Sequence, residues 1–214
     1  MKATIIFGIL GISALAFASI ADDFKDASNR DGCEAIPYSS ERGSCSSAGR
    51  DVDDWCKNSS RKWSCDDLDP SGQKRNIENV TSKIADLKKE KDDLDYKRNN
   101  SSDENERKEY EKKIEDKKSQ IEVLQKKVED WTKQLADEKD MAGKRKDIGD
   151  QCVKNRIAVK NIFANVKAKV QSESDPDAKQ YVSRLVDKYS SAEKGHQEAI
   201  DITNRGIEKC NGMK

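Results

Sequence analysis

Apolar residues between Gln73 and Asp140 recur in two stripes, with alternating spacings of three and four residues. This alternation is the rhythm of the heptad repeat, in which one narrow apolar seam follows a helix. The pattern therefore predicts two amphipathic helices that bury only a thin seam. The seam positions are Ile77, Val80, Ile84, Leu87, Lys91 and Leu94 in the first helix, and Tyr110, Ile114, Lys117, Ile121, Leu124, Val128, Trp131 and Leu135 in the second.

The segment between the stripes is rich in Asn and Ser, which favour turns because their side chains bond to the nearby backbone. A capping box formed by Ser101 and Glu104 would begin the second helix. A turn before the first stripe leaves Ser71 or Gly72 to cap the first helix. Folding the chain at the central turn brings the two seams together in layers. We therefore expect an antiparallel coiled-coil hairpin over residues 71–141.

The second stripe continues without a change of phase as far as Val170. It predicts one helix over about residues 102–171, roughly 105 Å long at 1.5 Å per residue, and hence an elongated molecule. Gly143 and Gly149 oppose this continuity, because glycine costs about 1 kcal/mol relative to alanine inside a helix. The alternative is a break near Gly143 and a compact four-helix bundle.

A second hairpin is expected over residues 142–214, continuing the long helix. Asp175 is placed to cap its last helix, and Pro176 suits the first helical position, where a missing N–H costs nothing. Folding the chain at the preceding turn pairs Phe163 with Leu185. The predicted fold class is therefore mostly α, built from two helical hairpins.

Residues 1–21 have the features of a signal peptide. Lys2 is followed by an apolar run that is too short for a comfortable membrane span. Small residues suit cleavage after Ala21, or alternatively after Ala18. We therefore expect export to a periplasm or to the cell exterior, and no stable membrane insertion after cleavage.

Residues 22–70 differ in composition from the rest of the chain. Their hydrophobic periodicity is weak, apart from a possible short helix over residues 51–57. In an exported chain, an even set of cysteines indicates disulfides, and their spacing lacks the tight pairs of a zinc site. Trp55 and Trp63 are expected to form a small apolar core, with partner binding as their alternative role. This predicts a small, irregular, disulfide-stapled module that contains Cys33, Cys45, Cys56 and Cys65.

The predicted second hairpin restricts how Cys152 and Cys210 can pair. Its register places Cys152 opposite His196, about 14 residues from Cys210 and so roughly 21 Å away along the helix. A disulfide requires Cα atoms within about 7 Å. Both cysteines should therefore pair with the N-terminal module. Extension of the first hairpin register favours Cys65 for Cys210 and Cys45 or Cys56 for Cys152, which leaves one bridge inside the module.

The composition argues against a thick globular core and against most kinds of catalytic site. Charged residues make up 38% of the chain, against 34% hydrophobic residues. The 41 basic residues balance the 41 acidic ones, so no long-range attraction toward nucleic acid is expected. His196 is the only histidine, and the sequence contains no nucleophile elbow, phosphate-binding glycine loop or H-E-x-x-H pair. We therefore expect no enzyme activity, cofactor or metal.

These features together predict an exported, disulfide-stabilised coiled-coil protein that acts as a spacer, a scaffold or a clasp for a protein partner. One alternative is a secreted effector or surface antigen that binds through its Cys-rich module. Another is a periplasmic holding chaperone or adaptor. Because the chain supplies its own helical partners, a monomer or weak dimer is expected. N-glycosylation sequons begin at Asn58, Asn79, Asn99 and Asn100.

Overall fold

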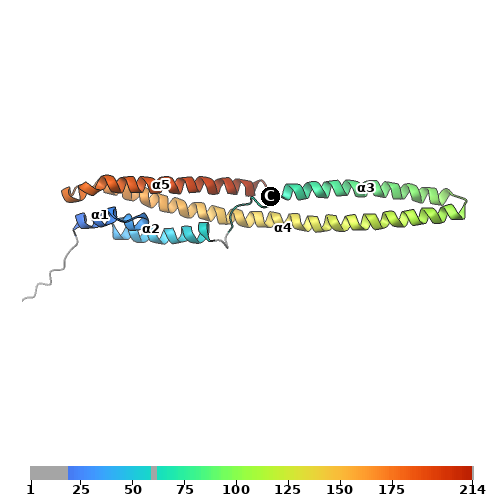
Figure 1. Cartoon of the computed structure of the whole chain (residues 1–214), viewed down its shortest axis with the longest axis horizontal. Coiled ribbons are helices and arrows are strands. Elements are labelled where there is room, and N and C mark those ends of the chain that lie inside the picture. The colour runs from blue at the N-terminus through green and yellow to red at the C-terminus, as the bar shows by residue number, and fades with distance from the viewer. Residues whose placement is uncertain (1–18, 59–61, 214) are drawn as a thin grey trace, which may run out of the picture. The chain divides into compact units, whose positions relative to one another are not determined.

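The computed structural model describes residues 19–58 and 62–213, of which 87% are helical and none forms a β-strand (Figure 1). The expectation of a mostly α protein is therefore confirmed. The elements in chain order are α1 (Ile20–Ser28), the 3-10 helix η1 (Gly32–Ala35), α2 (Ser39–Val52), the π-helical turn η2 (Asp53–Lys57), α3 (Pro70–Asn100), α4 (Glu104–Gln171) and α5 (Pro176–Asn211).

The helices form two compact units. Unit 1 consists of Met1–Gly49 and Ala158–His196, and unit 2 consists of Arg50–Ile157 and Gln197–Lys214. Both units therefore draw on α2, α4 and α5, each of which contributes a different stretch to each unit. The domain boundaries expected at residues 70 and 141 stay predictions.

The helix α4 is one continuous helix of 68 residues, as the unbroken seam predicts. The alternative break near Gly143 is not present. Gly149 is required for a different reason, because a Cβ atom there would lie 2.6 Å from Cγ1 of Ile207 on α5. Gly149 therefore lowers the stability of the isolated helix but allows α4 and α5 to approach closely in unit 2.

Two of the three predicted helix starts are wrong by a few residues. Asp69, not Ser71 or Gly72, is the N-cap of α3, and its carboxylate accepts a hydrogen bond from the Gly72 N–H at 2.9 Å. Asp103 caps α4 in place of the Ser101 capping box, accepting from the Asn105 N–H at 2.7 Å. A carboxylate immediately before the first helical residue reaches the free N–H groups most directly.

The third start is confirmed. Asp175 accepts hydrogen bonds from the N–H groups of Asp177 at 2.8 Å and Ala178 at 3.0 Å, and α5 begins at Pro176. Asp69 and Pro70 repeat the same Asp-Pro signal at the start of α3. The signal was therefore present in the sequence at both helices.

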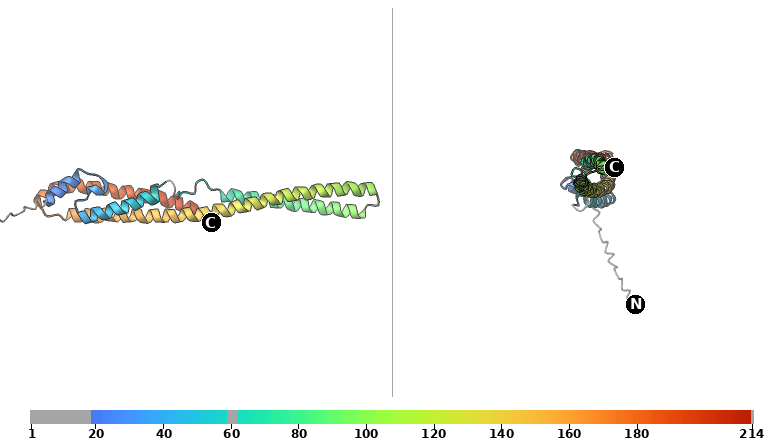
Figure 2. Two further views of the ribbon diagram at one scale, coloured as in Figure 1. Left: turned by 90° about the horizontal axis from the view of Figure 1, so that it is seen from below. Right: turned by 90° about the vertical axis from the view of Figure 1, so that its right-hand side faces the viewer.

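In unit 2, α3 and α4 pack as a helical hairpin and lie side by side in both views (Figures 1 and 2). Their buried cluster consists of Ile84, Leu87 and Ile121, with Val80, Leu124 and Val128 packed against it. The seam lysines are neutralised, because Lys117 pairs with Glu90 at 2.5 Å and Lys91 with Asp95 at 2.9 Å. The apolar seam is therefore thin, and ion pairs replace apolar contacts at the seam positions closer to the turn.

In unit 1, α4 and α5 also pack as a hairpin, but its side-chain pairing differs from the prediction. The ring of Phe163 lies 6.0 Å from that of Tyr189 and 6.1 Å from that of His196, which stand about one and three helical turns beyond the predicted partner, Leu185. Side chains lean towards the N-terminus of their own helix. In an antiparallel hairpin this lean moves side-chain contacts of the first helix away from the turn, which is the direction of the offset seen for Phe163.

The expectation of an irregular segment over residues 22–70 is wrong, because most of its first half is helical. The short helix expected over residues 51–57 is the π-helical turn η2, which follows α2 directly. The helix α2 is rich in Ser and Gly, so its own pattern is a poor signal. Burial of Cys45 and Val52 stabilises it instead. Most of the predicted signal peptide, residues 1–18, lies outside the described residues.

Candidate functional site

All six cysteines form disulfides. The predicted link of Cys65 to Cys210 is present, with Cα atoms 5.3 Å apart. Of the two candidates for Cys152, the structure selects Cys56, at 5.1 Å. The third bridge stays within the N-terminal segment and joins Cys33 to Cys45. Two bridges therefore attach Cys56 and Cys65 to α4 and α5 in unit 2.

The environment of Cys152 corrects the predicted register. Its sulfur lies 4.0 Å from the hydroxyl of Thr203, and not opposite His196 as expected. The ring of His196 lies 6.1 Å from that of Phe163 in unit 1. The conclusion drawn from that register still holds, because Cys152 and Cys210 do not pair with each other.

The tryptophans singled out by the sequence are both half-buried in unit 2. A Cβ atom at Gly206 of α5 would clash with the ring of Trp63, so this ring packs directly on the α5 backbone. Trp63 is therefore part of the packing that attaches its segment to the helices. Trp55 lies in η2, next to Cys56. A partner-binding role for either residue stays a prediction.

Charge also holds the segment that carries Trp63. Arg145 of α4 donates to the Ser64 carbonyl at 3.0 Å and pairs with Asp67 at 2.5 Å. Lys62 approaches the same carboxylate at 2.9 Å. The hydrogen bond from Arg145, aided by Lys62, holds the pKa of Asp67 well below its usual range. Arg145 lies on the continuation of the second apolar stripe beyond Leu135, and the sequence did not indicate that it would contact this segment.

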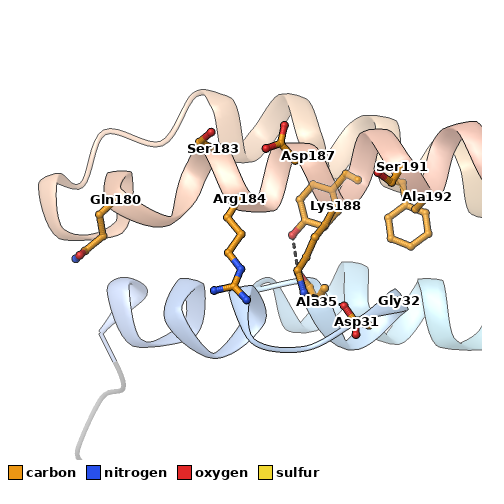
Figure 3. A pocket seen from close by; sticks show the side chains of 12 residues that line it. Asp31, Gly32, Ala35, Gln180, Ser183, Arg184, Asp187, Lys188, Ser191 and Ala192 are labelled. Atoms are coloured by element: carbon orange, nitrogen blue, oxygen red, sulfur yellow. Dashed lines mark hydrogen bonds and ion pairs between the residues drawn. The ribbon is translucent and has the colours of Figure 1, made fainter.

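A groove of about 610 Å³ lies in unit 1, between α5 and the segment that leads into η1 (Figure 3). The N-terminal segment contributes Asp31, Gly32 and Ala35, and α4 contributes Phe163. The remaining lining residues come from one stretch of α5, between Gln180 and Ala192. The groove is therefore built by parts of the chain that are far apart in the sequence.

Several bonds hold the η1 wall of the groove against α5. The buried hydroxyl of Tyr189 donates to the Ala35 carbonyl at 2.6 Å. Lys188 donates to the Arg30 carbonyl and pairs with Asp31 at 2.8 Å. Gly32 has a φ of +57°, a conformation that favours glycine where the chain enters η1. Specific bonds therefore position this wall at several points.

The electrostatics of the groove follow from these contacts. The hydrogen bond and charge of Lys188 lower the pKa of Asp31, so this carboxylate stays ionised and neutralises the ammonium. Burial raises the pKa of Tyr189, so its hydroxyl keeps its proton and remains a donor. The groove thus has one neutralised ion pair at the η1 wall.

A polar stripe on α5 faces that wall. Gln180, Arg184 and Lys188 recur every four residues, so they lie on one face of the helix. The Gln180 amide donates to the Asp177 carbonyl at 2.8 Å, and Lys188 is bonded as described. Among the residues that the structure describes, Arg184 forms no hydrogen bond and no ion pair within 4.0 Å. It is exposed, and Figure 3 shows it reaching from α5 towards the N-terminal segment.

Sequence reasoning missed this groove completely. In the sequence, Arg184 and Lys188 belong to the charged surface of a predicted helix, where a solvated face is the ordinary interpretation. Asp31 precedes a cysteine and shows no ligand-binding motif. Only tertiary packing brings the two segments together.

Within residues 19–58 and 62–213, no group of three or more His, Cys, Asp or Glu side chains is arranged to hold a metal ion. None of the helices there combines the length and the apolar character needed to cross a bilayer. No protein family model, curated protein or solved structure matches this chain.

Proposed function

We propose that this chain is an exported, disulfide-stabilised scaffold or clasp that binds a protein partner without chemical turnover. In this proposal, α3 and α4 form an antiparallel coiled coil that serves as a spacer, and the groove of unit 1 is the contact point for the partner. The mature protein would act in a periplasm or outside the cell, as a monomer or weak dimer.

The observation that carries the proposal is the pair of long-range bridges, Cys56–Cys152 and Cys65–Cys210. Disulfides persist in oxidising compartments and are rare in the cytosol, so the bridges fit a chain that works outside it. A thin helical seam buries little apolar surface, and cross-links between distant segments compensate for a small core. This combination suits a durable scaffold.

A second candidate function is an effector or surface antigen that binds through its Cys-rich segment. The η1 wall favours this candidate, since Asp31, Gly32 and Ala35 belong to that segment. The scaffold form of our proposal differs from this candidate because its partner contacts also extend along the α3–α4 hairpin. The chaperone alternative has less support, because residues 99–106, where the hairpin turns, contain no apolar side chain that could hold an unfolded client.

Site-specific photo-crosslinking in the native envelope or culture medium tests the proposal. The photoreactive residue replaces Ser183 in the groove or, as a matched serine control, exposed Ser82 on α3. A clasp predicts one defined protein adduct from position 183. Adducts from both positions would indicate a scaffold that also uses the hairpin. If neither position yields an adduct, or if the chain stays in the cytosol with free thiols, the proposal is wrong.

A further inference from the structure

We propose that the groove between η1 and α5 binds an acidic side chain on a peptide segment of the partner, with Arg184 as the carboxylate-binding residue. This inference rests on the proposed function in one respect, namely that the partner is a protein. It goes further by specifying the chemistry of the partner segment.

Arg184 is available for such a ligand. Its guanidinium carries five N–H donors in a planar fork that matches a carboxylate in bidentate geometry. The neighbours at i−4 and i+4, Gln180 and Lys188, already donate to groups of the protein. Arg184 forms no such bond within the described part of the chain, although its side chain lines the groove. The groove thus presents one guanidinium with its donors unused.

The other charges that the structure describes in the groove form no ion pair with Arg184, although its charge contributes, after the hydrogen bond and charge of Lys188, to lowering the pKa of Asp31. The ion pair of Asp31 with Lys188, at 2.8 Å, cancels one charge of each sign. Asp187 is the remaining carboxylate of the groove, and in Figure 3 it lies on the side of α5 away from the N-terminal segment, whereas Arg184 points towards that segment. A single negative charge is therefore complementary to the η1 side. The repulsion between Asp31 and a phosphate of charge −2 would be twice the repulsion between Asp31 and a single carboxylate at the same distance.

The rest of the lining suits a peptide more than a small free anion. Ser183 and Ser191 lie four residues before and after Asp187, on the face of α5 that carries this carboxylate. Their hydroxyl groups both donate and accept, as the backbone of a peptide that extends from Arg184 across the helix requires. The ring of Phe163, which is buried and also packs on Tyr189, adds an apolar surface for a neighbouring side chain. The volume of about 610 Å³ is within the usual range for a ligand pocket.

The Cys33–Cys45 bridge links binding to the N-terminal wall. Cys33 lies between Gly32 and Ala35, which both line the groove, and its partner Cys45 is fully buried in α2. Without this bridge, the wall is held to α5 mainly by the bonds of Tyr189 and Lys188. Binding should therefore weaken when the bridge is removed, even though Arg184 remains.

The test is an NMR titration of the oxidised, ¹⁵N-labelled chain beginning at residue 19 with two peptides, Ac-Ala-Phe-Glu-Ala-NH₂ and its Gln counterpart. An exposed carboxylate–guanidinium pair contributes up to about 1 kcal/mol, so the Glu peptide should bind about fivefold more tightly. Shifts should centre on residues 180–192. Arg184→Gln should abolish the preference, whereas Arg205→Gln, an exposed arginine on the α5 stretch of unit 2, should retain it. Circular dichroism verifies that both variants keep their helices.

Several results would overturn the inference: equal affinity for the two peptides, no binding of either, or an unchanged preference in Arg184→Gln. The Cys33→Ala/Cys45→Ala variant should weaken binding of the Glu peptide, and retention of full affinity would refute the role of the bridge. Failure here is distinguishable from failure of the proposed function. A partner adduct from position 183 together with no Glu preference rejects only the acidic ligand, and a Glu preference without any adduct rejects only the clasp.

Discussion

The Cys65–Cys210 bridge allows a quantitative prediction. The variant Cys65→Ala/Cys210→Ala removes a link between positions 145 residues apart in the sequence. Both side chains are fully buried, in a cluster with Leu68 and Ala142. Alanine is used because it leaves no unpaired thiol and no buried hydroxyl. The change therefore tests the cross-link with little added chemistry.

The expected cost follows from the loop that the bridge closes in the unfolded chain. The Cys56–Cys152 bridge remains, so the shortest closed path contains the 9 residues from Cys56 to Cys65 and the 58 from Cys152 to Cys210. For a loop of this size, chain entropy predicts a loss of about 4 kcal/mol in the free energy of unfolding. This figure is an upper value, because a compact unfolded chain gains less entropy. The Cys33–Cys45 bridge, between residues 12 apart, should contribute only about 3 kcal/mol.

Urea unfolding monitored by tryptophan fluorescence is the appropriate assay. All three tryptophans, Trp55, Trp63 and Trp131, lie in unit 2, so their emission reports the unit that contains the bridge. With a urea m-value of about 1–3 kcal/mol/M, a loss of about 4 kcal/mol lowers the midpoint by about 1–4 M. Cys33→Ala/Cys45→Ala, in unit 1, is the control and should move this fluorescence midpoint less.

An unchanged midpoint in the Cys65→Ala/Cys210→Ala variant would refute the entropic reasoning. Peptide mapping of the oxidised protein tests its premise separately. A linked peptide that joins Cys152 to Cys210 would contradict the pairing itself and would require a different packing of α4 and α5 in unit 2.

The remaining predictions concern packing, pH and a helix cap. Gly206→Ala should destabilise unit 2 by about 1–3 kcal/mol, because the new methyl group clashes with the ring of Trp63. Gly143→Ala has open space around it and should stabilise α4 by up to about 1 kcal/mol. Thermal melts compare the two variants, and equal effects on stability would contradict the packing of Trp63. The lowered pKa of Asp67 contributes stability that is fully present above about pH 4, the pKa of Asp in the unfolded chain, and is lost as the pH falls towards the pKa in the folded protein. Asp67→Asn should therefore flatten the acid limb of a plot of stability against pH, and its difference from wild type should shrink as the pH falls. Ser19 caps α1 through a capping box, in which its hydroxyl accepts a hydrogen bond from the Asp22 N–H at 3.2 Å. In a chain of residues 22–214, α1 should be less stable by about 1 kcal/mol than in a chain that begins at Ser19, as measured by amide hydrogen exchange. Identical protection of α1 in both chains would exclude this role of Ser19.

Most of the helical content of this protein could be predicted from the order of its residues. Heptad spacing predicts α3, α4 and α5, because 3.6-residue periodicity is a local property that reads directly from the order of apolar residues. The Asp-Pro pair at Asp175 marks a helix start for the same local reason. The link of Cys65 to Cys210 was also predicted, from the even number of cysteines and from a hairpin register that the structure corrects.

Tertiary structure decided the features that depend on contacts between distant segments. The Ser- and Gly-rich α2 is helical because Cys45 and Val52 are buried, which its own pattern does not indicate. The exact partners across α4 and α5 depend on the register of the packed hairpin, which places Phe163 beside Tyr189 and His196 and places Cys152 beside Thr203. The groove is the extreme case. Arg184 is an ordinary surface charge in the sequence, and it lines a groove only because packing, the Tyr189 hydroxyl and a disulfide hold residues 31–35 beside it.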